Sequence, residues 1–94
     1  MAKIIWSDQS LEDLEAIADY IAKDSPRYAG VFLENILQYA ETLTLFPAMG
    51  RKVPEVEDEN VREIFYKRYR IIYEHKANAI EILTIIHGSR LLER

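Results

Sequence analysis

Hydrophobic and polar residues alternate in three different ways along the chain. The segment from Ala2 to Trp6 is short and rich in β-branched and aromatic residues, which is typical of a strand. Apolar residues then recur at steps of three and four, at Leu11, Leu14, Ile17, Ala18 and Ile21. Candidate helix caps precede them at Ser7, Asp8 and Ser10, and Ser10 with Asp13 has the spacing of a capping box. This pattern predicts an amphipathic helix that ends near Lys23 or Asp24.

A second helical pattern begins at Ser25-Pro26, where a hydroxyl cap precedes proline at the first helical position. Its apolar positions are Ala29, Phe32, Leu33, Ile36, Ala40 and Leu43. Pro47 ends this pattern, and Ala48 to Gly50 forms a turn. Since the connection between the two helices is very short, we expect an antiparallel hairpin with apolar faces that another layer must cover.

Residues 51–60 form a loop with Pro54 and four acidic residues. After this loop, the spacing of apolar residues changes from a period of 3.6 to a period of 2. Segments rich in Val, Ile, Tyr and Phe follow at 61–66, 69–75 and 79–87. The turns between them are short, so neighbouring strands must be antiparallel. We predict a single α+β domain over residues 1–94, in the order β-α-α-β-β-β, with the αα-hairpin on one face of a mainly antiparallel sheet. The place of the first strand in that sheet stays open.

Composition narrows the class of protein. The chain has 94 residues and no cysteine, so disulfides and thiolate metal sites are excluded, and we expect a cytoplasmic protein without metal or cofactor. No apolar run approaches the roughly 20 residues that span a bilayer, so no membrane association is expected. The net charge of -4 argues against binding nucleic acid by bulk electrostatics, and we expect no sequence-specific DNA binding by this chain alone.

Positive charge is concentrated in the second half of the chain. Residues 1–50 carry three basic and eight acidic side chains, whereas residues 51–94 carry nine basic and eight acidic side chains. The excess is local, at Arg62, Lys67, Arg68, Arg70 and Lys76. Such a cluster suits an anionic partner, and it equally suits a solvated hairpin rim.

Several stretches, taken in order, resemble the RelE/ParE toxin superfamily over essentially the whole chain. They are residues 13–22, Ser25-Pro26, Phe46-Pro47 with Gly50-Arg51, residues 61–64, residues 69–73 and residues 86–90. The resemblance implies the toxin of a type II toxin-antitoxin pair, also known as a plasmid stabilisation protein. It also implies a cognate antitoxin that covers apolar grooves of the toxin with a helix or strand.

The superfamily contains two mechanisms. RelE-like members cut mRNA on the ribosome, whereas ParE-like members inhibit DNA gyrase by binding it. By resemblance, Arg70 and Arg90 match two arginines of the RelE pattern. If the turn at 76–78 pairs Arg70 with Thr84, alternation places Arg70 and Arg90 on one face, where both guanidinium groups flank one anion. His87 then falls on the opposite face as a structural histidine.

The lysines of RelE-type nucleases have no counterparts, because Val61, Glu63 and Phe65 occupy those positions, and a terminal tyrosine acid is absent. An acid and two hydrophobes cannot stabilise a transition-state phosphate. We therefore favour the ParE-like mechanism, with gyrase binding and no chemistry. The expected target-binding residues are arginines and tyrosines, which concentrate interface energy: Arg62, Tyr66, Arg70, Tyr73 and Arg90. Tyr73 also suits a core position.

Two alternatives stay open. The loop around Glu55 resembles that of YoeB-type nucleases, which implies an endoribonuclease acting with ribosome and mRNA through Glu55, Arg70, His87 and Arg90. In that case the chain is an enzyme. Glu55 is otherwise one acid among four in a solvated loop. The second alternative is a toxin fold that has lost toxicity and only binds an antitoxin.

Overall fold

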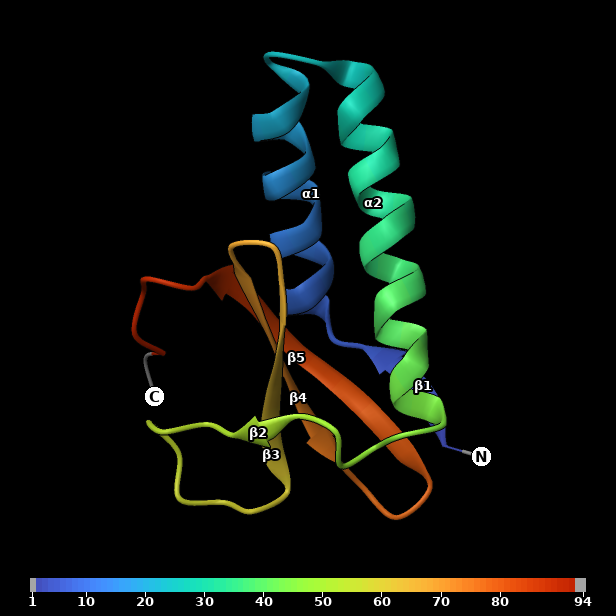
Figure 1. Cartoon of the computed structure of the whole chain (residues 1–94), viewed down its shortest axis with the longest axis vertical. Coiled ribbons are helices and arrows are strands. Elements are labelled where there is room, and N and C mark those ends of the chain that lie inside the picture. Colours follow the sequence, from blue (N-terminus) through green and yellow to red (C-terminus); the bar gives the residue numbers. More distant parts are fainter. Residues whose placement is uncertain (1, 93–94) are drawn as a thin grey trace.

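Two helices pack across one face of a five-stranded sheet in the computed structural model, which describes residues 2–92 (Figure 1). The elements are β1 (Lys3–Trp6), α1 (Asp8–Ala22), α2 (Pro26–Glu41), the 3-10 helix η1 (Thr42–Thr44), β2 (Arg51–Lys52), β3 (Val61–Tyr66), β4 (Tyr69–His75) and β5 (Ala79–His87). The strand order is β1-β5-β4-β3-β2. The α+β class and the helical hairpin are therefore confirmed.

The meander of β3, β4 and β5 is antiparallel and has the bounds that the period of two predicted. The first strand, β1, pairs parallel with β5 at one edge of the sheet, a position that the sequence leaves open. At the other edge, β2 pairs antiparallel with β3, from Arg51 opposite Glu63 to Lys52 opposite Arg62. The sequence does not predict β2, because two charged residues carry no alternating pattern.

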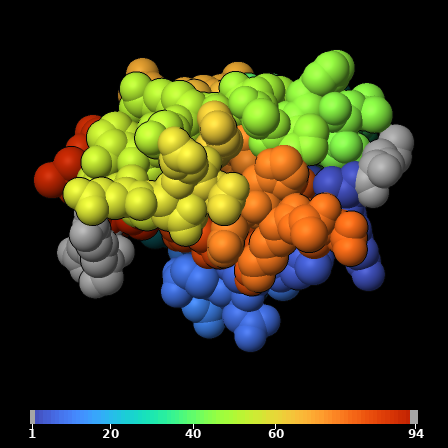
Figure 2. All heavy atoms as spheres, turned by 90° about the horizontal axis from the view of Figure 1, so that it is seen from below, coloured from blue at the N-terminus to red at the C-terminus, as the bar shows by residue number. Residues whose placement is uncertain are grey.

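Both faces of the sheet are covered. On the helix side, Leu14, Phe32 and Ile36 join a core built on Ile71, Tyr73 and other residues of the meander. On the opposite side, Val53 and Ile72 belong to a smaller core with Val61, packed against Val56, Leu83, Ile86 and Leu92. The loop of residues 51–60 therefore covers apolar surface of the sheet, whereas its polar sequence predicts a solvated loop. Figure 2 shows the segment after α2 and the β4–β5 turn forming the surface at the end away from the helical hairpin.

The start of α1 differs from the predicted capping box. Ser7 is the N-cap and accepts a hydrogen bond from Ser10 N. Ser10 lies inside the helix, fully buried, and its hydroxyl donates to Ser7 O. Asp13 turns to β5 instead, where its Oδ2 accepts from Thr84 Oγ1 at 2.6 Å and from Ile85 N at 2.9 Å. A tertiary contact thus takes the side chain that the local motif would have used.

Those contacts stabilise an irregularity in the β4–β5 ladder. Tyr73 pairs with Ile82 but Ile72 pairs with Thr84, so one extra residue, Leu83, bulges from β5. Ser7 Oγ donates to Leu83 O at 2.8 Å. Beyond the bulge, Arg70 lies opposite Ile86, and the predicted pairing with Thr84 is wrong.

The second helix ends earlier than the apolar spacing predicts. α2 stops at Glu41, and η1 continues to Thr44. Thr42 Oγ1 donates to Tyr39 O at 2.6 Å, and Thr44 Oγ1 donates to Glu41 O at 2.8 Å. These hydroxyls satisfy carbonyl groups at the helix end and favour a tighter last turn before Pro47.

Candidate functional site

Arg70 lies at the centre of an ionic network on the face of the sheet away from the helices. Only 4% of the residue is exposed. Its Nε donates to Glu63 Oε1 at 2.6 Å, and its Nη1 and Nη2 donate to the two carboxylate oxygens of Glu55 at 2.9 Å each. Nη1 also donates to the carbonyl oxygen of Arg90 at 2.9 Å. The fork of Arg70 is therefore engaged by two carboxylates and by the tail that follows β5.

Glu63 connects a second arginine, Arg51, to the network of Arg70. Its side chain is fully buried and bridges Arg70 to Arg51, whose Nε donates to Glu63 Oε2 at 2.6 Å. Arg51 reaches solvent, with 61% of its side chain exposed. Among residues 2–92, every buried side-chain nitrogen and oxygen has a hydrogen-bond partner. Strand alternation alone does not predict this role of Glu63, although an acid on the same face of the strand as Val61 is a signal of a buried partner.

Glu55 connects the network to the C-terminal tail. Its Oε2 accepts from Leu92 N at 2.9 Å as well as from Arg70. The hydrogen bonds from Arg70 and then from Leu92 N lower the pKa of the Glu55 carboxyl from 4.5 to about 2. A carboxylate with so low a pKa holds protons too weakly to serve as an efficient general base near neutral pH.

The low pKa of Glu55 predicts an acid-dependent part of the stability. Because the pKa is lower in the folded chain, the stabilisation is complete above the unfolded pKa near 4.5 and is lost as the pH falls towards 2. We expect Glu55→Gln to be less stable than the parent at neutral pH and to show a flatter pH profile in that window. Urea unfolding at several pH values, followed by Trp6 fluorescence, measures both effects.

Glu57→Gln is the matched control, since Glu57 is an exposed carboxylate of the same loop. Its profile should follow that of the parent. Parallel profiles for the parent and Glu55→Gln would contradict the role assigned to Glu55.

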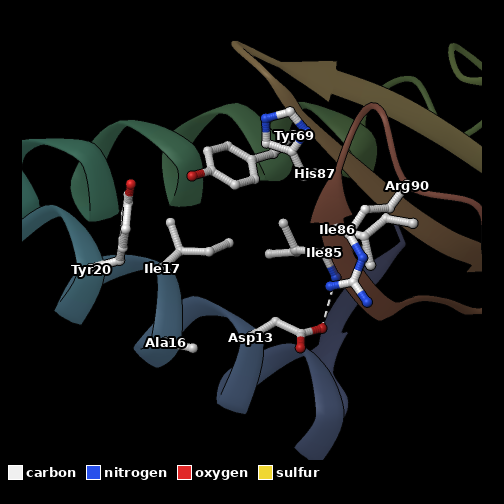
Figure 3. Close-up of a pocket in the computed structure, with 9 residues that line it drawn as sticks. All are labelled: Asp13, Ala16, Ile17, Tyr20, Tyr69, Ile85, Ile86, His87 and Arg90. Atoms are coloured by element: carbon white, nitrogen blue, oxygen red, sulfur yellow. Dashed lines mark hydrogen bonds between the residues drawn. The ribbon is translucent and has the colours of Figure 1, made fainter.

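Arg90, unlike Arg70, lies at the surface. Arg90 is exposed and borders a hollow of about 480 Å³ between α1 and β5, together with Asp13 and the apolar side chains of Ala16, Ile17, Ile85 and Ile86. Figure 3 shows Asp13 and Arg90 at one end of this α1–β5 hollow. Arg90 also lines a hollow of about 280 Å³ together with Arg70 and Glu55. The guanidinium of Arg70 is already paired there with Glu55 and Glu63, so the binding of one anion by both arginines stays a prediction.

His87 lies apart from Glu55 and Arg70. It pairs with Tyr69 across the β4–β5 ladder, and the two rings meet edge to face with centroids 5.8 Å apart. His87 Nδ1 and Ser89 Oγ are 2.8 Å apart in a hydrogen bond. Figure 3 shows His87 and Tyr69 together beside the α1–β5 hollow. Of the proposed nuclease residues, Glu55, Arg70 and Arg90 line one hollow, whereas His87 lies on the helix side.

The remaining predicted target residues differ in how far they are accessible. Tyr73 is fully buried, and its hydroxyl donates to Pro47 O at 2.7 Å, so it has no surface to offer a partner. The same holds for buried Arg70. Arg62 is half-buried and donates to Gly50 O at 2.8 Å. Tyr66 is half-buried, and the centroid of its ring lies 5.5 Å from that of the Phe32 ring. Arg90 is the most exposed of the five.

Neither a metal cluster nor a membrane segment is present in the part of the chain that the structure describes. Within residues 2–92, no group of three or more His, Asp or Glu side chains is arranged to hold a metal ion. Neither helix in that range combines the length and the apolar character needed to cross a bilayer.

Comparison with known proteins gives consistent results over nearly the whole length. A family model described as "ParE toxin of type II toxin-antitoxin system, parDE" matches residues 4–92. Toxin RelE2 of Caulobacter vibrioides is 32% identical over 92 residues, which cover 97% of this chain and 100% of that relative.

A solved structure supports the fold. The chain resembles one described as the chromosomal ParDE TA system from P. aeruginosa, with a TM-score of 0.77 over 93% of this chain and 96% of that one. The two sequences are 24% identical, so this likeness concerns the arrangement of helices and strands.

Proposed function

Because this chain belongs to the ParE toxin family of type II toxin-antitoxin systems, within the RelE/ParE superfamily, we propose that it arrests growth by binding and inhibiting DNA gyrase. We propose further that a cognate antitoxin neutralises it by direct binding, and that both interactions take place in the cytoplasm. In this proposal the chain acts by recognition and makes or breaks no covalent bond.

The observation that supports binding over mRNA cleavage is the occupied guanidinium of Arg70. Cleavage of RNA at a phosphate needs cations that face the reacting phosphate and a general base for the ribose hydroxyl. Arg70 is neutralised by Glu55 and Glu63, and the pKa of Glu55 is lowered to about 2. Arg90 alone is a poor substitute for that set of groups.

We assign gyrase binding to arginine and tyrosine side chains around the sheet. The exposed Arg90, which follows β5, is the principal anchor. The half-buried Arg62 and Tyr66, near the two ends of β3, are further contacts. Arginine and tyrosine contribute much of the binding energy at protein interfaces because each combines a large apolar area with hydrogen bonding.

The α1–β5 hollow suits the antitoxin. Its apolar floor of Ile17, Ile85 and Ile86 has a charged residue of each sign, Asp13 and Arg90, at one end (Figure 3). An amphipathic helix or strand of the antitoxin would cover this surface. Arg90 borders the hollow, so a bound antitoxin would also cover the main anchor for gyrase.

Replacement of Arg90 is expected to separate activity from stability. The purified chain should inhibit DNA supercoiling by gyrase, and Arg90→Ala should need on the order of tenfold more protein for half-inhibition while keeping its unfolding midpoint. Lys76→Ala is the matched control, because Lys76 is an exposed cation in the β4–β5 turn, paired with Glu81 at 2.7 Å. It should inhibit gyrase as the parent does.

The same protein induced in cells without its antitoxin distinguishes the other mechanisms. We expect DNA damage and filamentous cells with intact mRNA. Prompt cleavage of mRNA while supercoiling continues would instead establish the ribosome-dependent nuclease. Normal growth on induction would indicate a non-toxic module that only binds an antitoxin.

A further inference from the structure

The turn between β3 and β4 presents two cations, Lys67 and Arg68, and Lys67 has a backbone conformation that does not suit a lysine. Lys67 has a φ of 52° and is the only residue in the described part of the chain with a positive φ. Glycine or asparagine adopts this left-handed conformation readily, whereas a lysine pays a conformational cost. A residue held in a conformation that glycine or asparagine would adopt at lower cost often marks a functional position.

Neighbouring contacts hold this turn in place. Gly88 N donates to Arg68 O at 2.6 Å and so ties the turn to the end of β5. Lys67 Nζ lies 5.8 Å from the centroid of the Tyr66 ring. Both Lys67 and Arg68 are exposed, and neither forms an ion pair with any residue between 2 and 92. The turn therefore offers two cations in a defined position.

An apolar hollow of about 220 Å³ lies beside these cations. It is lined by Ile21, Tyr28, Phe32, Lys67, Arg68 and Tyr69. The Phe32 ring is almost fully buried and meets Tyr69 edge to face at 5.6 Å, which gives the hollow a rigid side. Tyr28 is 44% exposed at its rim. None of these six lining residues is acidic, in a chain whose net charge is -4.

We propose that this cationic corner, defined by those six lining residues, binds an acidic segment of a partner protein. One apolar or aromatic side chain of the segment occupies the hollow, and flanking carboxylates pair with Lys67 and Arg68. The corner shares only Tyr69 with the lining of the α1–β5 hollow, so it is a separate surface. The proposal does not depend on which enzyme the toxin inhibits.

The chemistry of the corner favours protein over nucleic acid. Binding to a phosphate backbone needs a row of cations, and its strength grows with the number of phosphates neutralised. Only two of the lining residues are basic, whereas the other four are apolar or aromatic. Such a composition matches an apolar anchor with a few adjacent carboxylates.

A titration of the whole chain with synthetic peptides tests the proposal. The probe is a short peptide in which glutamates flank one phenylalanine, and the readout is the change in backbone amide chemical shifts. We expect shifts at Tyr28 and at residues 67–69 that weaken as the salt concentration rises. Peptides with lysine for glutamate, or with serine for phenylalanine, should bind at least about tenfold more weakly.

The variant Lys67→Gly separates binding from folding. It should bind the acidic peptide on the order of tenfold more weakly, while its Tm rises by roughly 4 °C because the strain is relieved. Lys76→Ala, in the other turn of the meander, should bind as the parent does. Parent affinity in Lys67→Gly, equal binding of the lysine peptide, or no shifts at the corner would each overturn the proposal. Tighter binding of oligothymidylate than of the acidic peptide would overturn it in favour of nucleic acid.

Discussion

Arg70→Leu is expected to lower the free energy of unfolding by about 3 to 5 kcal/mol. The physical reason is the buried carboxylate of Glu63, which would lose its buried partner and keep only the hydrogen bond from the exposed Arg51. Glu55 and the carbonyl of Arg90 would lose the hydrogen bonds from Arg70 as well, although Glu55 keeps the one from Leu92 N. Urea unfolding at neutral pH, followed by Trp6 fluorescence, measures the loss.

Two companion variants test the cause of that loss. Arg90→Ala removes an exposed side chain but keeps the carbonyl that Arg70 contacts, so its stability should change by no more than about 0.5 kcal/mol. The double variant Arg70→Leu/Glu63→Leu removes both buried charges and should recover part of the stability. If the double variant is no more stable than Arg70→Leu, the loss does not come from an uncompensated Glu63.

A loss of toxicity in an Arg70 variant would report a loss of folding before a loss of target contact. An Arg70 variant that no longer arrests growth is expected to be a poorly folded protein, because the guanidinium is buried among its own partners. Arg90 is the more informative position, since its side chain is exposed and its replacement leaves the network intact. Activity assays at both positions therefore need the unfolding measurement beside them.

Gly50→Ala is expected to destabilise the fold by about 3 kcal/mol. A Cβ at this position would lie 2.6 Å from Tyr73 Oη and 2.7 Å from the backbone oxygen of Glu63. The backbone of β3 cannot yield without breaking its pairing, so Tyr73 must move and its hydrogen bond from Gly50 N, 3.0 Å long, is lost. The Tm should fall by roughly 15 °C for a domain of this size.

Gly30→Ala is the matched control, because it makes the same chemical change in the middle of α2. Apart from the two neighbouring residues and the adjacent helix backbone, no atom lies within 4 Å of the added methyl group at that position. Replacing a helical glycine by alanine should raise the stability by roughly 0.5 to 1 kcal/mol. A Gly50→Ala variant that melts with the parent would show that the segment before β2 can shift without cost.

Local patterns in the sequence determine most of the secondary structure. The starts of both helices follow from caps and from proline at the first helical position, and the bounds of β3, β4 and β5 follow from a period of two between short turns. The resemblance of several stretches to the RelE/ParE superfamily also identifies the family from sequence alone. These features depend on residues close together in the chain, so each segment carries its own signal.

Tertiary structure decided what the charged residues do. Asp13 follows Ser10 at the spacing of a capping box, yet it holds the Leu83 bulge, because β5 brings two donors to its carboxylate. Glu55 stands among three other acids in a polar loop, yet it is the one that reaches Arg70, because Val53 and Val56 fold that loop over the second face of the sheet.

The sequence by itself therefore determined most of the elements, the fold class and the family of this protein, whereas only the folded chain decided that Arg70 is a buried partner and Arg90 an exposed one. Arg70 lies within a predicted strand and Arg90 just beyond the last one, and alternation along the strands predicts both on one face. What separates them is the position of Glu55, Glu63 and the tail in space, since an arginine's role is set by the carboxylates that pack against it, and these come from distant parts of the chain.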